Sequence, residues 1–180
     1  MGHDLSFRPL QREDFPALSA WLADPAVQPW WVERSDPEGV DAHYGPSVDG
    51  DRRTEHFVIV AEGRDVGMVQ RYRNSEWPEW DHAIGIAGAA SIDYLLGAEA
   101  DRGRGLGSAA IAAFTDEVFA AYPDVEVVVA APQQANVASW RALEKAGFTR
   151  VWEGILDSDD PSDAGPAYVY VRRRPTTVTV

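Results

Sequence analysis

Arg102-Gly103-Arg104-Gly105-Leu106-Gly107 is the stretch of sequence that decides the fold of this chain. It lies between an extended apolar run, 91–96, and an alanine-rich segment of helical period, 107–122. Its three glycines let backbone N–H groups approach a ligand without interference from a Cβ atom. A helix that begins directly behind them adds unpaired amides and the positive end of its dipole. The stretch therefore predicts a site for a pyrophosphate group.

Apolar periodicity on both sides of this loop predicts alternating strands and helices. Ahead of the loop we expect strands at 5–10, 57–61, 66–72 and 91–96, helices at 12–23 and 37–48, and a loop at 74–82. Behind it we expect helices at 107–122 and 136–146 and strands at 125–131, 148–156 and 167–172. This order predicts an α/β or α+β chain, with a central mixed, mostly antiparallel sheet flanked by helices. The strands at 91–96 and 125–131 should be parallel and joined by a right-handed crossover.

The length and composition indicate an acidic globular protein. A chain of 180 residues predicts one domain, which we assign to 1–174, followed by a loose tail at 175–180. The formal net charge of −13 argues against nucleic acid and anionic membranes as partners and favours cationic small molecules. The sequence leaves open whether the chain is a monomer or a homodimer.

Several classes of protein are excluded by what the sequence lacks. There is no cysteine, so disulfides, thiolate zinc sites and cysteine nucleophiles are excluded. The four histidines have no i, i+4 pairing, so we expect no metal site. No secretory signal and no membrane-spanning apolar stretch is visible, which predicts a cytoplasmic protein.

Two familiar phosphate-binding loops fit the glycine stretch poorly. A P-loop needs a lysine followed by Ser or Thr after its last glycine, and Gly107-Ser108 lacks that lysine. A dinucleotide fingerprint fits 105–110 loosely. It also requires an acidic residue at the end of the next strand, where this chain has Val129-Ala130-Ala131.

The loop, taken with a second motif, resembles the GNAT N-acetyltransferase superfamily. Its pyrophosphate loop has the form Q/R-x-x-G-x-G/A, which 102–107 matches, and 136–148 resembles its Asn-led helix ending in E-K-x-G-F. The resemblance implies acetyl-CoA as cofactor, with the loop amides on the pyrophosphate and the strand before the loop pairing with pantetheine. The cofactor-binding residues it implies are Tyr94, Leu95, Leu96, Arg102, Gly103, Arg104, Gly105, Leu106, Gly107, Ser108 and Asn136.

Asp93 is the candidate catalytic residue. Acetyl transfer needs a neutral amine, and a free amine is mostly protonated at neutral pH. A carboxylate can orient the ammonium and accept its proton. Asp93 lies on the apolar strand that enters the loop, where a charge is costly unless it is paired or solvated. The alternative is an aspartate at a strand end that caps a neighbouring turn.

Within the superfamily, 91–96 with 105–107 is similar to the aminoglycoside 6′-N-acetyltransferases, in which the corresponding segment carries a functional aspartate. Trp30-Trp31, Gln70-Arg71-Tyr72 and 165–168 are also similar to that branch. The resemblance implies an enzyme that acetylates the 6′-amine of an aminoglycoside and so confers antibiotic resistance. A sister branch acylates a hydroxylysine-type amine in siderophore biosynthesis but usually has His where Asp93 stands. A non-catalytic module that binds coenzyme A is the alternative from another class.

Two acidic loops, 76–81 and 157–163, are expected to surround the acceptor amine, because carboxylates and Trp faces suit a ligand with several ammonium groups. The predicted substrate-binding residues are Trp30, Trp31, Gln70, Tyr72, Glu76, Trp77, Trp80, Asp81 and Asp163. Two positions depart from the family pattern. Leu143 stands where many members carry a tyrosine that protonates the leaving thiolate, and Ala131 stands where the aminoglycoside branch tends to have an acid.

Overall fold

The computed structural model describes residues 3–176, whose seven strands form one sheet in the order β1-β2-β3-β4-β5-β7-β6. Only β4 and β5 run parallel, while every other neighbouring pair is antiparallel. The predicted mixed, mostly antiparallel sheet and its parallel pair are therefore confirmed. The strands are β1 (Leu5–Pro9), β2 (Thr54–Ala61), β3 (Arg64–Arg73), β4 (Ala90–Leu96), β5 (Val127–Ala130), β6 (Thr149–Ile155) and β7 (Pro166–Arg173).

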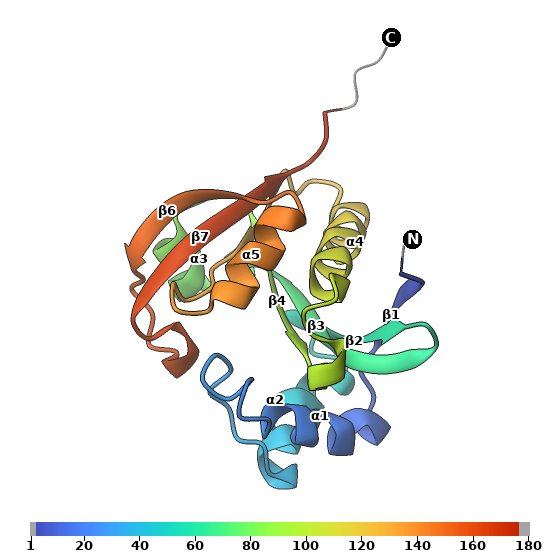
Figure 1. Ribbon diagram of the computed structural model, residues 1–180. Helices are drawn as coiled ribbons and strands as arrows, with labels where there is room; N and C mark the ends of the chain where they lie inside the picture. The colour runs from blue at the N-terminus through green and yellow to red at the C-terminus, as the bar shows by residue number, and fades with distance from the viewer. Residues whose placement is uncertain (1–2, 177–180) are drawn as a thin grey trace.

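Helices cover both faces of the sheet, with α1 and α2 on one side and α4 and α5 on the other (Figure 1). The α-helices are α1 (Phe15–Leu22), α2 (Pro37–Val48), α3 (Pro78–Ile84), α4 (Leu106–Ala121) and α5 (Val137–Lys145). Short 3-10 turns are η1 (Arg12–Asp14), η2 (Asn74–Glu76), η3 (Glu99–Asp101) and η4 (Pro161–Asp163). No helix within residues 3–176 is long and apolar enough to cross a membrane. The tail predicted at 175–180 lies mostly outside the described residues.

The loop predicted at 74–82 is wrong, because η2 and α3 occupy it. Pro78 stands in the first turn of α3, where the missing N–H is no loss. Glu79 and Asp81 in the same turn favour the positive end of the helix dipole, and Gly85, at φ +66°, ends the helix in the left-handed conformation. A helix of seven residues is too short to give a clear apolar period, and the polar and aromatic composition of this segment is typical of a loop. The helix could therefore not be predicted from the sequence.

Strand β4 separates two parts of the hydrophobic core. Ile92 packs in the cluster that α4 and α5 complete, while Leu95 packs with Leu18, Tyr44 and their neighbours from α1 and α2. Because successive side chains of a strand point to opposite faces, Asp93 shares the face of Leu95. The carboxylate is therefore on the α1 and α2 side of the sheet.

The sheet splits between β4 and β5. These strands pair only at Ala90 with Val128 and at Ser91 with Val129. The rest of β4, as far as Leu96, pairs with β3 alone among the described residues. One backbone edge of 92–96 therefore faces a gap in the sheet, directly before the glycine loop.

Candidate active site

The glycine loop forms a cradle of backbone amides at the start of α4. Within the described part of the chain, no acceptor is bonded to the backbone N–H groups of 103–108. Gly103 and Gly105 have φ of +72° and +80°, and a Cβ added at either would meet no atom within 4 Å. Left-handed backbone at both positions therefore turns a run of exposed donors toward open space. Such a run at a helix N-terminus fits the pyrophosphate that the sequence predicts.

The two arginines of the loop have different surroundings. Arg102 turns inward, where its guanidinium donates to the carbonyl oxygens of Leu96 and Gly97 at 3.1 and 2.6 Å and pairs with Asp24 at 3.1 Å. Arg102 therefore ties the loop to the end of β4. Arg104 is exposed and makes no ion pair or hydrogen bond within residues 3–176, so its charge is available to an anion. We expected both to bind the cofactor directly, and the structure gives Arg102 an internal set of partners.

The split edge of β4 faces the beginning of α5. The Tyr94 hydroxyl lies 2.8 Å from Ser139 Oγ, and Asn136 caps α5 by accepting from the Ser139 amide at 3.3 Å. All three residues line the same cavity. The free edge of β4 and Asn136 thus adjoin one cavity, and the loop amides follow the end of β4 along the chain. This arrangement suits an extended ligand with amide groups and a diphosphate. Leu143, further along α5, is fully buried in the core and does not line this cavity.

This cavity is large and acidic. Its volume is about 1120 Å³, and it is bounded by α2, α3, β4, η4 and the segments around them. Eight carboxylates line it: Glu33, Asp51, Glu79, Asp93, Asp157, Asp159, Asp160 and Asp163. Arg53 is the lone arginine or lysine among the lining residues, and it is already paired with Asp51 at 2.7 Å. The cavity therefore attracts cations.

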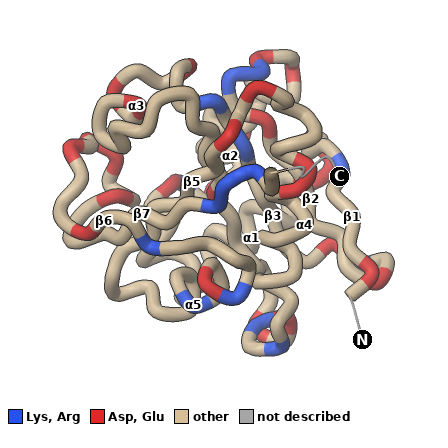
Figure 2. The backbone as a smooth tube through the Cα atoms, turned by 90° about the horizontal axis from the view of Figure 1, so that it is seen from above, with Lys and Arg blue, Asp and Glu red and all other residues tan. Residues whose placement is uncertain are grey.

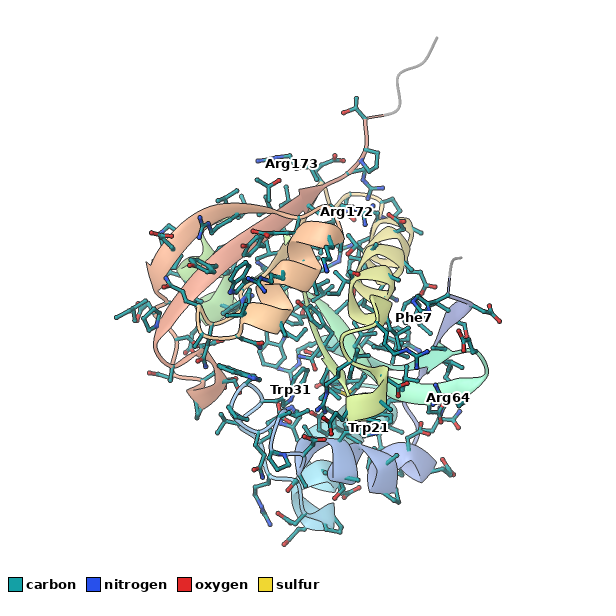
Figure 3. The ribbon with its side chains drawn as sticks, viewed as in Figure 1. Phe7, Trp21, Trp31, Arg64, Arg172 and Arg173 are labelled. Atoms are coloured by element: carbon teal, nitrogen blue, oxygen red, sulfur yellow. The ribbon has the colours of Figure 1, made fainter. Side chains whose placement is uncertain are left out.

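The distribution of charge along the backbone agrees with this. Figure 2 shows acidic residues recurring along α3 and in the segment between β6 and β7. Arg172 and Arg173 lie instead at the C-terminal end of β7 and do not line the cavity (Figure 3). The negative potential of the chain is thus gathered around the cavity as well as spread over the surface.

Most of the predicted acceptor residues meet in this cavity. Those that line it are Trp30, Trp31, Gln70, Tyr72, Trp77, Trp80 and Asp163. Glu76 and Asp81 do not line it, and Asp81 faces a separate shallow depression beside Gly85. For Asp81 the formation of α3 explains this, because a helix sends neighbouring side chains in different directions, while Glu76 lies in the preceding turn η2.

Sequence reasoning missed several residues of the cavity wall. They include Glu33, His43, Asp51 and His56. The sequence marks them only as polar residues beside apolar segments. They lie in separate segments of the chain, so the sequence does not indicate that they meet. The strand predicted at 57–61 begins after His56, so the sequence did not show that His56 would face a cavity.

Asp93 is partly exposed to the cavity and otherwise surrounded by protein. Its Oδ2 accepts a hydrogen bond from Gln70 Nε2 at 2.9 Å. Burial raises the pKa of Asp93 to about 6, and the nearby charges of Asp163 and Asp160 add to the rise, although hydrogen bonds from Gln70 and Tyr72 oppose it. A carboxyl group poised near neutral pH, in a cation-attracting cavity, can accept a proton from an amine.

The cavity wall is fastened by Ser162 of η4. The Val32 amide donates to Ser162 Oγ at 2.9 Å, and Gln133 Nε2 donates to its carbonyl oxygen at 2.8 Å. In Figure 1 the loop after α1 accordingly approaches the turn before β7.

Two tryptophans lie between the N-terminal helices and the rest of the molecule. Figure 3 shows Trp31 there, with Trp21 below it. The Trp21 ring packs against Gly97 so closely that a Cβ there would lie 2.1 Å from it.

Taken together, the split sheet, the amide cradle and the adjoining acidic cavity define an acetyltransferase. A family model described as the acetyltransferase (GNAT) domain matches residues 11–156, so the chain belongs to the GNAT acetyltransferase family. Among curated proteins, the chain is 28% identical over 177 residues to "Aminoglycoside N(6′)-acetyltransferase type 1" of Klebsiella pneumoniae, covering 94% of this chain and 83% of that protein. The protein of the same name from Serratia marcescens matches to the same extent.

Solved structures give the same result. The crystal structure of the aminoglycoside acetyltransferase AAC(6′)-Ib in complex with coenzyme A superposes with a TM-score of 0.77 at 26% identity, covering 95% of each chain. Structures of AAC(6′)-Ib with acetyl-CoA and paromomycin, and with coenzyme A and kanamycin, superpose with the same TM-score. An uncharacterised protein from Bacillus halodurans shares the fold, with a TM-score of 0.80 at 21% identity. The predicted fold and the predicted superfamily are confirmed.

Proposed function

We propose that this chain transfers the acetyl group of acetyl-CoA to the 6′-amine of an aminoglycoside. The observation that carries the proposal is the position of Asp93, which faces the acidic cavity from the strand whose free edge leads to the amide cradle. The similarity to aminoglycoside acetyltransferases, among them AAC(6′)-Ib with bound coenzyme A and kanamycin, supports it. Acetyl-CoA supplies the activated acetyl group. The residues of the chain bind and orient the donor and the acceptor, and they accept a proton from the amine.

The donor would be held by the backbone. The amides of 103–108 would bind the pyrophosphate, Arg104 would add a positive charge, and the edge of β4 would pair with the pantetheine amides. The unpaired donors and the open space beside Gly103 and Gly105 fit these groups. We expect Arg102 to support the loop from behind.

The acceptor would enter as a polycation. The acidic wall favours ammonium groups, and the faces of Trp30 and Trp77 suit sugar rings and cations. Asp93 accepts a proton from the reacting ammonium, so an N–H bond breaks, an O–H bond forms and the electron pair stays on nitrogen. The neutral amine then forms the new bond to the acetyl carbon as the thiolate leaves, and the nitrogen passes its second proton to that thiolate, which gives the amide and the free thiol. Because the chain has no cysteine, a cysteine acyl-enzyme is excluded and transfer is direct.

The experiment is a thiol-release assay with acetyl-CoA against aminoglycosides with and without a free 6′-amine, polyamines and lysine derivatives. We expect release with aminoglycosides that carry the 6′-amine, and loss of at least about a hundredfold in kcat for Asp93→Asn with acetyl-CoA affinity retained. Release with hydroxylysine-type amines and longer acyl donors alone would favour the siderophore branch. Binding of acetyl-CoA without thiol release in the presence of any of these amines would indicate a non-catalytic binding module.

A further inference from the structure

One positive side chain, Arg53, lies in the wall of the acidic cavity. It belongs to the irregular segment between α2 and β2, and no other arginine or lysine of the described residues lines the cavity. Its guanidinium carbon lies over the ring of Trp77, 5.0 Å from the ring centroid. The same guanidinium donates to both carboxylate oxygens of Asp51, from Nη2 to Oδ2 at 2.7 Å and from Nε to Oδ1 at 3.2 Å.

Trp77 and Asp51 together offer what a cation needs for binding. The face of an indole ring attracts a positive charge, and a carboxylate accepts its hydrogen bonds. Both residues line the cavity, and the negative charge of Glu76 acts on the same position by raising the pKa of Arg53. Hydrogen bonds from Arg53 lower the pKa of Asp51, so the pair is charged at neutral pH. Arg53 therefore covers a ring face and a carboxylate that would otherwise be open to a cationic acceptor.

The contact of Arg53 is weak enough to be exchanged. Its side chain is 55% exposed and that of Asp51 is 36% exposed. Ion pairs and cation–ring contacts at exposed positions contribute little, because water solvates and screens the charges. The two partners of the ion pair are two residues apart in an irregular segment, so side-chain torsions alone can turn the guanidinium toward water. No strand or helix has to move.

We propose that Arg53 is an internal competitor of the acceptor. Its guanidinium covers Trp77 and Asp51 until an ammonium group of a polycationic acceptor takes its place. The inference rests on the proposed function, because the reacting amine of the same acceptor is then at Asp93. Only hydrogen bonds and one ring contact are exchanged, and no covalent bond is made or broken.

This exchange makes the affinity depend on a second ammonium group. A neutral sugar offers Asp51 no cation in return, and a monoamine uses its one ammonium at Asp93. Both should leave Arg53 in place. An acceptor with at least two ammonium groups can pair one with Asp93 and the other with Asp51. Arg53 is therefore a specificity-determining residue that selects polycations against simpler amines.

The first test is the affinity for kanamycin, measured by calorimetry without acetyl-CoA. Arg53→Gln frees the Trp77 face and the Asp51 carboxylate, so we expect Kd to fall about threefold to tenfold. Arg52→Gln is the matched control, because it removes the same charge from the neighbouring residue, which pairs with Glu55 at 3.5 Å and does not line the cavity. Its Kd should stay within about twofold of the native value. A Kd that is unchanged or higher in folded Arg53→Gln, or that falls equally in Arg52→Gln, overturns the inference.

The second test observes the displacement directly. Nitrogen-15 NMR of the native protein follows the Nε–H group of Arg53, which is identified by its loss in Arg53→Gln. Saturation with kanamycin should shift this signal and speed its exchange with water, because the bonds to Asp51 are lost. Saturation with 6-amino-6-deoxyglucose, a monoamine, should leave the signal in place. Bound kanamycin with an unmoved Arg53 signal overturns the inference, as does a monoamine that moves the signal equally.

Spermine, a polyamine without sugar rings, separates this inference from the proposed function. If spermine displaces Arg53 while kanamycin does not bind, the inference holds and the proposed acceptor is wrong. Acetyl transfer to kanamycin with Arg53 still bonded to Asp51 would leave the proposed function intact and overturn the inference. The inference is also overturned if neither polycation moves the Arg53 signal.

Discussion

The hydroxyl of Tyr94 and the Oγ of Ser139 lie 2.8 Å apart across the split between β4 and α5. Burial of Leu143 removes the position at which the family commonly carries a proton donor, so this pair is the hydroxyl source that the split offers. We expect Ser139→Ala and Tyr94→Phe each to lower kcat about tenfold or more, with little change in KM for acetyl-CoA.

Coupling between the two hydroxyls provides the control for that prediction. Residues that act as one unit show non-additive effects, so the double variant should lose scarcely more than either single variant. If the kcat losses of the two single variants multiply in the double variant, or if only KM changes, the two hydroxyls merely shape the pocket.

The two loop arginines should respond differently to removal. Arg104→Ala deletes a free charge, so we expect KM for acetyl-CoA to rise about threefold to tenfold, with a weaker dependence on salt and no change in stability. Arg102→Ala leaves the Leu96 and Gly97 carbonyls and Asp24 without their donor, so the free energy of unfolding should fall by about 1–3 kcal/mol. Denaturant unfolding and initial-rate kinetics measure both, and an exchange of the two phenotypes would contradict the assignment.

Asp93 should make the folded protein less stable at neutral pH. The pKa of Asp93 is about 6 in the folded protein, above the ordinary value of 3.8. Between these two pH values the native state therefore keeps a proton on Asp93 that the unfolded state has lost. The free energy of unfolding due to this group therefore falls as the pH rises through that window. We expect Asp93→Asn to be more stable by about 1–2 kcal/mol at pH 8 and equal to the native protein near pH 3.5. Urea unfolding at the two pH values tests this, and an equal difference at both would be the contrary result.

Asp163 and Asp81 offer a matched comparison of acidic residues inside and outside the cavity. Asp163→Asn removes one charge from the wall and Asp81→Asn removes one outside it. We expect KM for a polycationic acceptor to rise several-fold in the first variant and to stay within about twofold in the second. The difference should shrink in 0.5 M salt, where charges are screened over a few ångströms. Equal responses would mean that net charge, not the cavity, attracts the acceptor.

The donor half of the site was predictable because it is local in the sequence. The cradle of 103–108, the strand before it and the cap at Asn136 each depend on a few adjacent residues. Their turn chemistry and helical period therefore carry the information. The same locality explains why Asp93 could be assigned to the strand that enters the loop.

The acceptor half was predictable only in part, because it is assembled by distant contacts. The hydrogen bond from Val32 to Ser162 joins positions 130 residues apart. The alignment of His56 with Gln70 and of Gln70 with Asp93 depends on the register of three strands. Neither register nor loop closure can be derived from composition. The unexpected helix α3 then turned Asp81 away from a wall that we expected it to join.

The fastening of three surface segments at Ser162 has an evolutionary consequence. These segments carry the acceptor wall and contribute nothing to the cradle that grips the donor. Acceptor preference can therefore drift by changes in exposed loops while the acetyl-transferring apparatus stays intact. A randomised library confined to 28–33 and 157–163 is accordingly the place to select variants that modify new amines.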